Sequence, residues 1–253
     1  MATTGTASYT ISRNELITQA LRNLRVLEET DVANATQIRN CTGPLNMLLK
    51  NMQSNGLELW TYQQVIVPMV VGQNTYTIGP NGANVTTTRP LRLFEGSFIR
   101  DLSCTPYYDT PLRVISRREY MQYGSKSTQS VPNSVYYFSG ITDAGGTTSP
   151  STGYGTLYVY TNPSQNTRSL YLNFQRPIYD VSASTDEFDL PQEWFRCLSF
   201  MLAGDIGWTY PKVDPAYVKE MRNMGRELQN ELQNWSVEET SMYMQPDQQL
   251  YFR

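Results

Sequence analysis

Carboxylates are the only side chains in this sequence that could serve as acid–base catalysts, because the chain contains no histidine. The densest group comprises Asp186, Glu187, Asp189 and Glu193. Two carboxylates about 5–9 Å apart would suit a glycoside hydrolase that cleaves the cell wall. The same residues also lie before and within the first turn of a predicted helix, where the helix dipole favours acids. No second acidic segment lies in an apolar context that would raise a carboxyl pKa, so we interpret the group as structural.

Other catalytic and metal chemistries lack their residues. Without histidine, neither a Ser-His-Asp nor a Cys-His nucleophile can form, and no histidine-containing zinc site is possible. Cys41, Cys104 and Cys197 are widely spaced, which predicts buried free thiols in a reducing compartment. No calcium-loop or phosphate-loop pattern is present. We therefore predict a protein that is not an enzyme and needs no cofactor or metal.

Tyrosine and phenylalanine are concentrated in the middle of the chain, at Tyr107, Tyr108, Tyr136, Tyr137, Phe138, Tyr158, Tyr160 and Tyr171. One interpretation is a stacking platform for sugars or single-stranded nucleic acid. The other is a set of cross-strand pairs that close a core. Lysine and arginine are not interleaved with these rings to hold a phosphate backbone, which favours the cross-strand pairs.

The overall charge is small and negative, at −3 for 253 residues. Such a chain has no global field that attracts nucleic acid or an anionic membrane. The longest apolar run, Val65 to Val71, contains Pro68 and is too short to cross a bilayer, and the N-terminus does not resemble a signal peptide. We expect a soluble protein that is made in the cytoplasm.

Helical patterns occupy both ends of the chain. Ser12 and Glu15 form a capping box before one apolar stripe. A second helix is expected from an N-cap at Asp31, with a kink or break at Gly43-Pro44 and an end at Asn55-Gly56. Near the other end, 194–206 is apolar on nearly every side, and Asp214 followed by Pro215 opens a further helix to about residue 234.

Strand patterns fill the middle of the chain. Val65, Val67 and Met69, followed by a turn and by Tyr76 and Ile78, predict a hairpin whose first strand is an edge because of Pro68. Ser116 and Glu119 predict a short helix. Segment 142–154 is expected to be a loop. Further strands are predicted at 91–100, 111–115, 134–139, 156–161 and 169–175.

The predicted fold class is therefore α+β. Each helical pair has only one apolar stripe, so we expect the two pairs to form one four-helix bundle with a β-rich insertion lobe between them. The predicted domains are a helical ring-forming domain (1–60 and 180–236), the β-rich insertion (61–179) and a C-terminal tail (237–253).

Taken in order, several short motifs resemble the head-to-tail connector proteins, or tail adaptors, of short-tailed, podovirus-like bacteriophages. Each motif is weak alone, but they are collinear over nearly the whole chain. The resemblance rests on Glu15-Leu16-Ile17, Leu45 to Leu48, Gly56 to Trp60, Gly72-Gln73, Tyr76 to Gly79, Arg89 to Arg92, Asp109 to Leu112, Asp189 to Pro191, Glu193-Trp194 and Leu202-Ala203.

The resemblance implies a structural protein of the virion that forms a ring, usually a dodecamer, between the portal and the tail. DNA would pass through the channel without specific binding, and a tail nozzle, needle or fibre protein would attach below. A C-terminal segment would dock on the portal, for which the candidate side chains are Met242, Tyr243, Met244, Leu250, Tyr251 and Phe252. A tail-associated glycan-binding or fibre-attachment protein is the alternative.

Ring closure requires two different patches on each subunit that meet around an axis. The apolar segment 194–206 is our candidate for a surface shared by the subunit core and its neighbour, although such a helix could also be buried entirely within one subunit. The interface candidates are Trp194, Phe195, Phe200, Met201 and Trp208.

Overall fold

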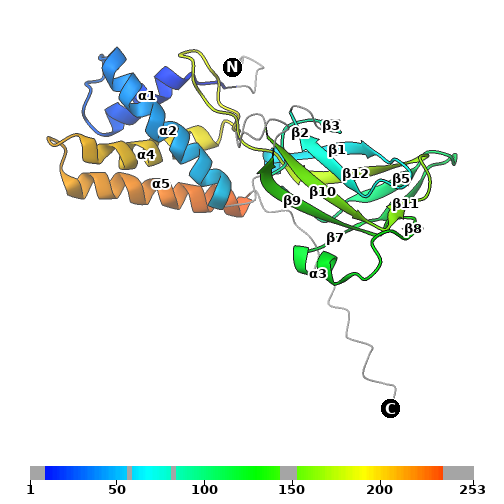
Figure 1. Cartoon of the computed structure of the whole chain (residues 1–253). Coiled ribbons are helices and arrows are strands. Elements are labelled where there is room, and N and C mark those ends of the chain that lie inside the picture. The colour runs from blue at the N-terminus through cyan, green and yellow to red at the C-terminus, as the bar shows by residue number, and fades with distance from the viewer. Residues whose placement is uncertain (1–8, 56–58, 81–83, 143–152, 236–253) are drawn as a thin grey trace. The chain divides into compact units, whose positions relative to one another are not determined.

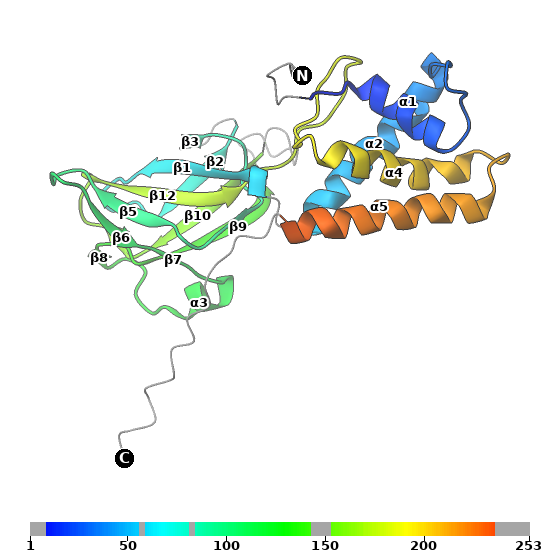
Figure 2. The same ribbon diagram turned by 180° about the vertical axis from the view of Figure 1, so that it is seen from behind.

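The computed structural model describes residues 9–55, 59–80, 84–142 and 153–235. The chain divides into two compact units (Figures 1 and 2). The helical unit combines Met1–Leu59 with Asp180–Arg253, and the β unit comprises Trp60–Tyr179. The predicted α+β class is confirmed: helices from both ends of the chain pack together, and the strands within the described residues form two five-stranded sheets and one small two-stranded sheet.

Four helices make up the described part of the helical unit. The most apolar of them, α4, packs against the other three, so both ends of the chain share one core. The arrangement is centred on this helix and is not a clear four-helix bundle, because α4 is covered on several sides as its sequence requires. The helices are α1 (Arg13–Asn23), α2 (Ala35–Asn55), α4 (Trp194–Ile206) and α5 (Pro215–Trp235), with the short 3₁₀ helices η1 (Leu59–Thr61) and η2 (Gly207–Thr209).

The starts of the first two helices are set by side-chain caps. Ser12 and Glu15 form the predicted capping box at α1. The prediction that Asp31 caps the second helix is wrong, because α2 begins at Ala35. There, Asn34 Oδ1 accepts from the N–H of Gln37 and Gln37 Oε1 accepts from the N–H of Asn34, both at 2.9 Å. This reciprocal pair satisfies two donors that the helix leaves open.

Of the kink or break predicted at Gly43-Pro44, the break is absent, because α2 continues through Pro44. A proline disfavours helical geometry in the preceding residue through clashes with the backbone N–H and the Cβ of that residue. Gly43 has no Cβ, which removes one of these clashes. The cysteine prediction also needs correction, because Cys41 and Cys197 are buried whereas Cys104 is exposed.

The antiparallel pair α4 and α5 lie side by side at very close range (Figures 1 and 2). A Cβ on Gly204 would lie 2.9 Å from the Cα of Arg222, and one on Gly225 would lie 2.9 Å from the backbone N of Met201. Both glycines are therefore required by the approach of the two backbones. Asp214 caps α5 as predicted, its Oδ1 accepting from the N–H of Ala216 at 2.9 Å.

The β unit contains two sheets that share one core. The first has the order β1 (Tyr62–Pro68), β12 (Arg168–Gln175), β5 (Phe98–Asp101) and β6 (Tyr108–Pro111), with β4 (Arg92–Leu93) also beside β12. The second has the order β3 (Val85–Thr86), β2 (Thr75–Gly79), β10 (Tyr154–Tyr160), β9 (Ser134–Thr142) and β7 (Arg113–Val114). A third, parallel pair is β8 (Gln129–Ser130) with β11 (Asn162–Pro163).

The predicted hairpin between the first two strands is wrong. β1 pairs with β12 in one sheet, whereas β2 pairs with β10 and β3 in the other, so the turn after Met69 carries the chain from sheet to sheet. Val67 and Ile78 therefore meet in the core between the sheets rather than side by side in one ladder. The predicted edge position of the strand containing Pro68 is confirmed.

The chain enters and leaves the β unit along neighbouring strands. Tyr62 is paired with Gln175, and the N–H of Arg176 donates to the carbonyl of Thr61 at 2.9 Å. The β unit is thus an insertion that begins and ends on two neighbouring strands of one sheet.

The short helix α3 (Arg117–Gln122) has the predicted capping box of Ser116 with Glu119.

Candidate functional site

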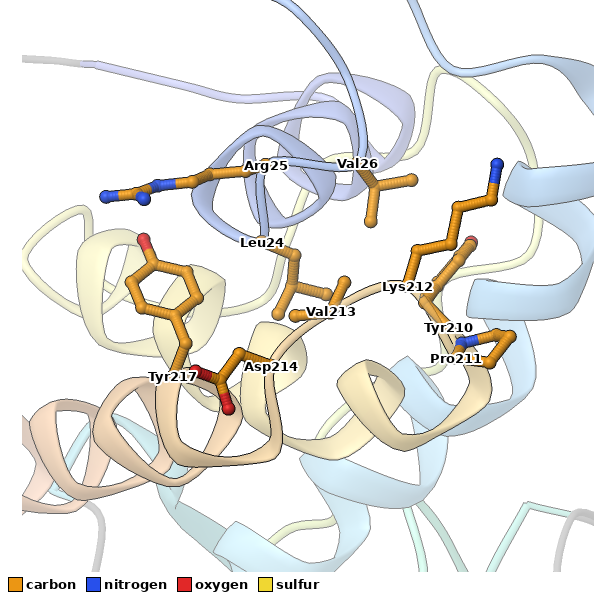
Figure 3. A pocket seen from close by; sticks show the side chains of 9 residues that line it. All are labelled: Leu24, Arg25, Val26, Tyr210, Pro211, Lys212, Val213, Asp214 and Tyr217. Carbon is orange, nitrogen blue, oxygen red and sulfur yellow. The ribbon is translucent and has the colours of Figure 1, made fainter.

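A pocket of about 540 Å³ opens in the helical unit between the end of α1, the α4–α5 connection and the start of α5 (Figure 3). We refer to it as the α1–α5 pocket. Its apolar floor and polar rim come from segments nearly 200 residues apart in the sequence. The lining residues are Leu24, Arg25, Val26, Tyr210, Pro211, Lys212, Val213, Asp214 and Tyr217.

The shape of this pocket depends on how α1 ends. Arg25 follows the last turn with a φ of 58°, a left-handed conformation that is uncommon for a residue with a side chain. Its guanidinium carbon lies 4.7 Å from the centre of the Tyr217 ring, a cation–π distance. The Tyr217 hydroxyl donates to the carbonyl of Asn23 at 2.9 Å, which ties α5 to the end of α1.

The chemistry of the pocket is that of a binding site. Leu24 is buried, Val26 and Val213 are partly exposed, and the exposed side chains of Arg25 and Lys212 place positive charge at the rim. The rim carboxylate of Asp214 is already bound to the α5 backbone. An aromatic or aliphatic side chain flanked by acidic residues would fit these surroundings.

The five predicted subunit-interface residues fall into two groups. Trp194 and Phe195 are buried in the core of the helical unit. Phe200 and Met201 are partly exposed, and Trp208 is 61% exposed. The latter three side chains can therefore contact a neighbour without rearrangement of the helical core. The six predicted portal-docking residues, from Met242 to Phe252, lie outside the described residues.

Further apolar side chains of the helical unit are exposed. Val32, Met47 and Trp235 are each 74% exposed. Single exposed apolar residues are normal in a monomer. The two exposed tryptophans, at 208 and 235, are the best candidates among these residues for contact with another protein, because tryptophan is strongly enriched at interface hot spots.

A second candidate surface lies on the outer face of the first sheet of the β unit. The Phe98 and Tyr171 rings are stacked, with centroids 4.9 Å apart, and Arg100 lies within cation–π distance of both and of Tyr107. Asp109 receives two hydrogen bonds from the same guanidinium, at 2.8 and 2.7 Å. These five residues, which we call the Arg100 cluster, form an ordered surface of the composition found in protein interfaces.

Asp109 also shifts the ionisation of Arg100. The hydrogen bonds that Arg100 donates to Asp109 are the main cause that raises the Arg100 pKa, and they also lower the pKa of Asp109. Both groups are thus charged over the physiological range, and the pair is neutral as a whole. Sequence reasoning identified only the tyrosines. The alternation of Phe98 and Arg100 along one strand was the available signal for the others.

Several of the other predicted aromatics form cross-strand and strand–helix pairs in the β unit. Tyr136 and Tyr158 are directly paired across β9 and β10, with stacked rings 5.6 Å apart, and Tyr120 of α3 packs against both. Tyr137 packs against the core between the sheets and donates to the carbonyl of Pro90. These residues therefore do not form one open platform.

The acidic group near Asp186 has a local structural role. Asp186 Oδ2 accepts from the backbone N–H groups of Ser182 and Ala183 at 2.8 and 2.6 Å, and these bonds lower its pKa. Glu187 forms an isolated β-bridge with Ser12. Within the described ranges, no three acidic or cysteine side chains lie close enough together to hold a metal ion.

Neither models of protein families nor curated protein sequences match the chain. Among the described residues, no helix is both long and apolar enough to span a membrane.

Proposed function

We propose that this protein is a structural adaptor that forms a ring between the portal and the tail of a short-tailed bacteriophage. The observation that supports it best is the use of both chain ends to build one helical unit, with a β unit inserted through a single pair of neighbouring strands. This division allows one unit to form ring contacts while the other binds a tail protein. The expected ring is a dodecamer in the virion, at the portal vertex.

The ring contact in this proposal uses the exposed side of the helical unit. Trp208, Phe200 and Met201 lie on or just after α4 and are at least partly exposed. A neighbour would cover them with a different patch, as a closed ring requires. Trp194 and Phe195 would contribute by holding α4 in place.

The channel in this proposal passes DNA without binding it. The chain has 20 basic and 23 acidic residues, and its basic side chains are distributed rather than clustered. A lumen of this composition would be neutral or negative and would not grip phosphates. Nanomolar retention of duplex DNA at moderate salt would contradict this part of the proposal.

The direct test mixes the full chain with purified portal rings encoded by the same genome and measures mass by light scattering. We expect a monomer alone and a stoichiometric ring on the portal, and no joining by a chain that ends at Ser236. Trp208→Ala should weaken joining while leaving stability within about 0.5 kcal/mol, because the side chain is mostly exposed. Lys219→Ala, an exposed change on α5, is the control. A truncated chain that still joins the portal would contradict the docking role of the tail.

A tail-associated glycan-binding or fibre-attachment protein is the second candidate. The observation in its favour is the exposure of Tyr107, a member of the Arg100 cluster, and of its neighbour in sequence Tyr108, at 59% and 68%. Exposed aromatic rings are suitable for stacking on sugars. Binding of host surface polysaccharide by the full chain, lost in Tyr107→Ala, would favour this function over the adaptor.

A further inference from the structure

We propose that in the free subunit the C-terminal segment 236–253 binds the α1–α5 pocket of its own chain. The segment would leave the pocket when a partner takes it up, a consequence that rests on the proposed adaptor function. The binding itself does not depend on that function. It follows from the chemistry of the pocket, the composition of the segment and the distance between them.

The pocket matches an aromatic anchor. Its floor is apolar, with Leu24 and Val213, and two tyrosine side chains, Tyr210 and Tyr217, stand at its walls (Figure 3). A volume of about 540 Å³ accommodates one or two aromatic side chains. The pocket is prepared in advance, because Tyr217 is held by its hydrogen bond to Asn23 and by the Arg25 guanidinium above its ring. Little ordering is then needed on binding.

The segment supplies the complementary groups. It carries three acidic side chains, Glu238, Glu239 and Asp247, against one basic side chain, Arg253. Its aromatic residues are Tyr243, Tyr251 and Phe252. The rim of the pocket carries two positive charges, from Arg25 and Lys212, and one negative charge, from Asp214, so its net charge is opposite to that of the segment. An acidic, aromatic segment is therefore matched to a pocket with an apolar floor and cationic rim.

The segment is also long enough to reach the pocket of its own chain. Tyr217 and Trp235 are 18 residues apart on α5, a distance of about 27 Å along the helix axis. The 17 residues from Ser236 to Phe252 span up to about 56 Å when extended, and on the order of 25 Å as a flexible chain. Since the typical length is close to the distance, the effective concentration of the segment at the pocket is near its maximum.

Binding within one chain would hold the segment back from premature contacts. All six side chains that are predicted to dock on the portal, Phe252 among them, belong to this segment. While the segment occupies the pocket, such contacts are blocked, and a portal must compete with the internal site. Free subunits would therefore stay monomeric until a portal draws the segment out of the pocket. If the protein is an adaptor, this competition would regulate when the ring forms.

The test uses two forms of the protein and needs no portal. The first is the chain ending at Trp235, which retains all the described helices and strands, and the second is the full chain. A fluorescent synthetic peptide of residues 236–253 is titrated with each. We expect the shortened chain to bind it and the full chain to bind it at least about tenfold more weakly, because its own segment competes.

Matched variants locate the site. Replacing Tyr251 and Phe252 in the peptide by alanine should weaken binding about 30-fold, and Lys212→Glu in the shortened chain about fivefold. Lys219→Glu makes the same charge change on an exposed residue of α5 outside the pocket and should have little effect. Thermal unfolding of each variant confirms that it is folded.

Any of four results would overturn the proposal. Three come from the titrations: absence of peptide binding to the shortened chain, equal binding by both forms, or equal effects of Lys212→Glu and Lys219→Glu. The fourth is the formation of concentration-dependent dimers by the full chain but not by the shortened chain, which would assign the pocket to the segment of a second copy. Since no portal is present, these outcomes are independent of whether the protein joins a portal.

Discussion

The two units of this protein differ in how their main elements approach each other. In the helical unit, two helices, α4 and α5, approach so closely that Gly204 and Gly225 leave no room for a Cβ. In the β unit, large side chains fill the space between two sheets, and Leu172, Phe174 and Tyr76 are almost completely buried. The contact between α4 and α5 therefore depends on two positions without side chains, and the contact between the sheets depends on large ones. Substitutions that add or remove atoms should affect the two units differently.

The largest effect is expected from removing volume in the β unit. Leu172 is fully buried in the core between the sheets, so Leu172→Ala should lower the free energy of unfolding by about 2–5 kcal/mol. Denaturant unfolding followed by hydrogen exchange would locate the loss. Ile66→Ala is the control, because Ile66 lies on the adjacent strand but is 49% exposed, and it should cost under about 1 kcal/mol. Equal losses in the two variants would argue against a filled core.

The next effect comes from adding one methyl group to the helical unit. Gly204→Ala places a Cβ against the backbone of Arg222 and should destabilise this unit by about 1–3 kcal/mol. Gly124→Ala adds the same group after α3, where nothing lies within 4 Å, and should change stability by less than about 0.5 kcal/mol. A clear loss for Gly204→Ala alone is the result expected in thermal unfolding, and equal losses would contradict the close-approach explanation. Simultaneous loss of protection in the β unit would show that the two units unfold together.

A smaller effect is expected at the surface of the β unit. Tyr171→Ala removes the ring that stacks on Phe98 and contacts Arg100. Aromatic pairs contribute about 0.5–1.5 kcal/mol beyond the area they bury, so a loss near 1 kcal/mol is expected from the missing stack. Tyr171→Phe retains the stack and is the matched control. A loss in the control as large as in the alanine variant would show that the hydroxyl, rather than stacking, matters.

Local signals in the sequence predicted the helices well. The capping boxes at Ser12 and Ser116 and the apolar run 194–206 each specify structure within a few residues, and all three are confirmed. Asp31 failed as a cap because an equally good cap, Asn34 with Gln37, follows three residues later. Caps of similar strength compete, and packing selects between them.

Long-range partners could not be predicted in the same way. The alternation in β1 and β2 shows which face of each strand is buried, but it does not show that β1 pairs with β12, more than 100 residues away. The same limit applies to the sites. Arg25 and Lys212, or Phe98 and Tyr171, meet only after the chain has folded, and neither pair leaves a spacing pattern in the sequence.

The smallest expected effect is a pH dependence confined to the β unit. Asp101 accepts from the hydroxyl and N–H of Ser103 and from Arg168, which lower its pKa from 3.8 to about 2. A carboxyl with a lowered pKa in the folded state stabilises the protein fully above its unfolded-state pKa of about 3.9, and this stabilisation is lost as the pH falls towards 2. The difference in unfolding free energy between the natural protein and Asp101→Asn should thus be constant above about pH 5 and shrink between pH 4 and pH 2. Ser103→Ala removes the largest cause of the shift, so the folded-state pKa of Asp101 should rise towards its unfolded value, and the stability lost between pH 4 and pH 2 should be smaller. A difference that stays constant down to pH 2 would mean that ionisation of Asp101 does not contribute to stability. The stability of the helical unit should not differ between the natural protein and either variant at any pH, because both substitutions lie in the β unit.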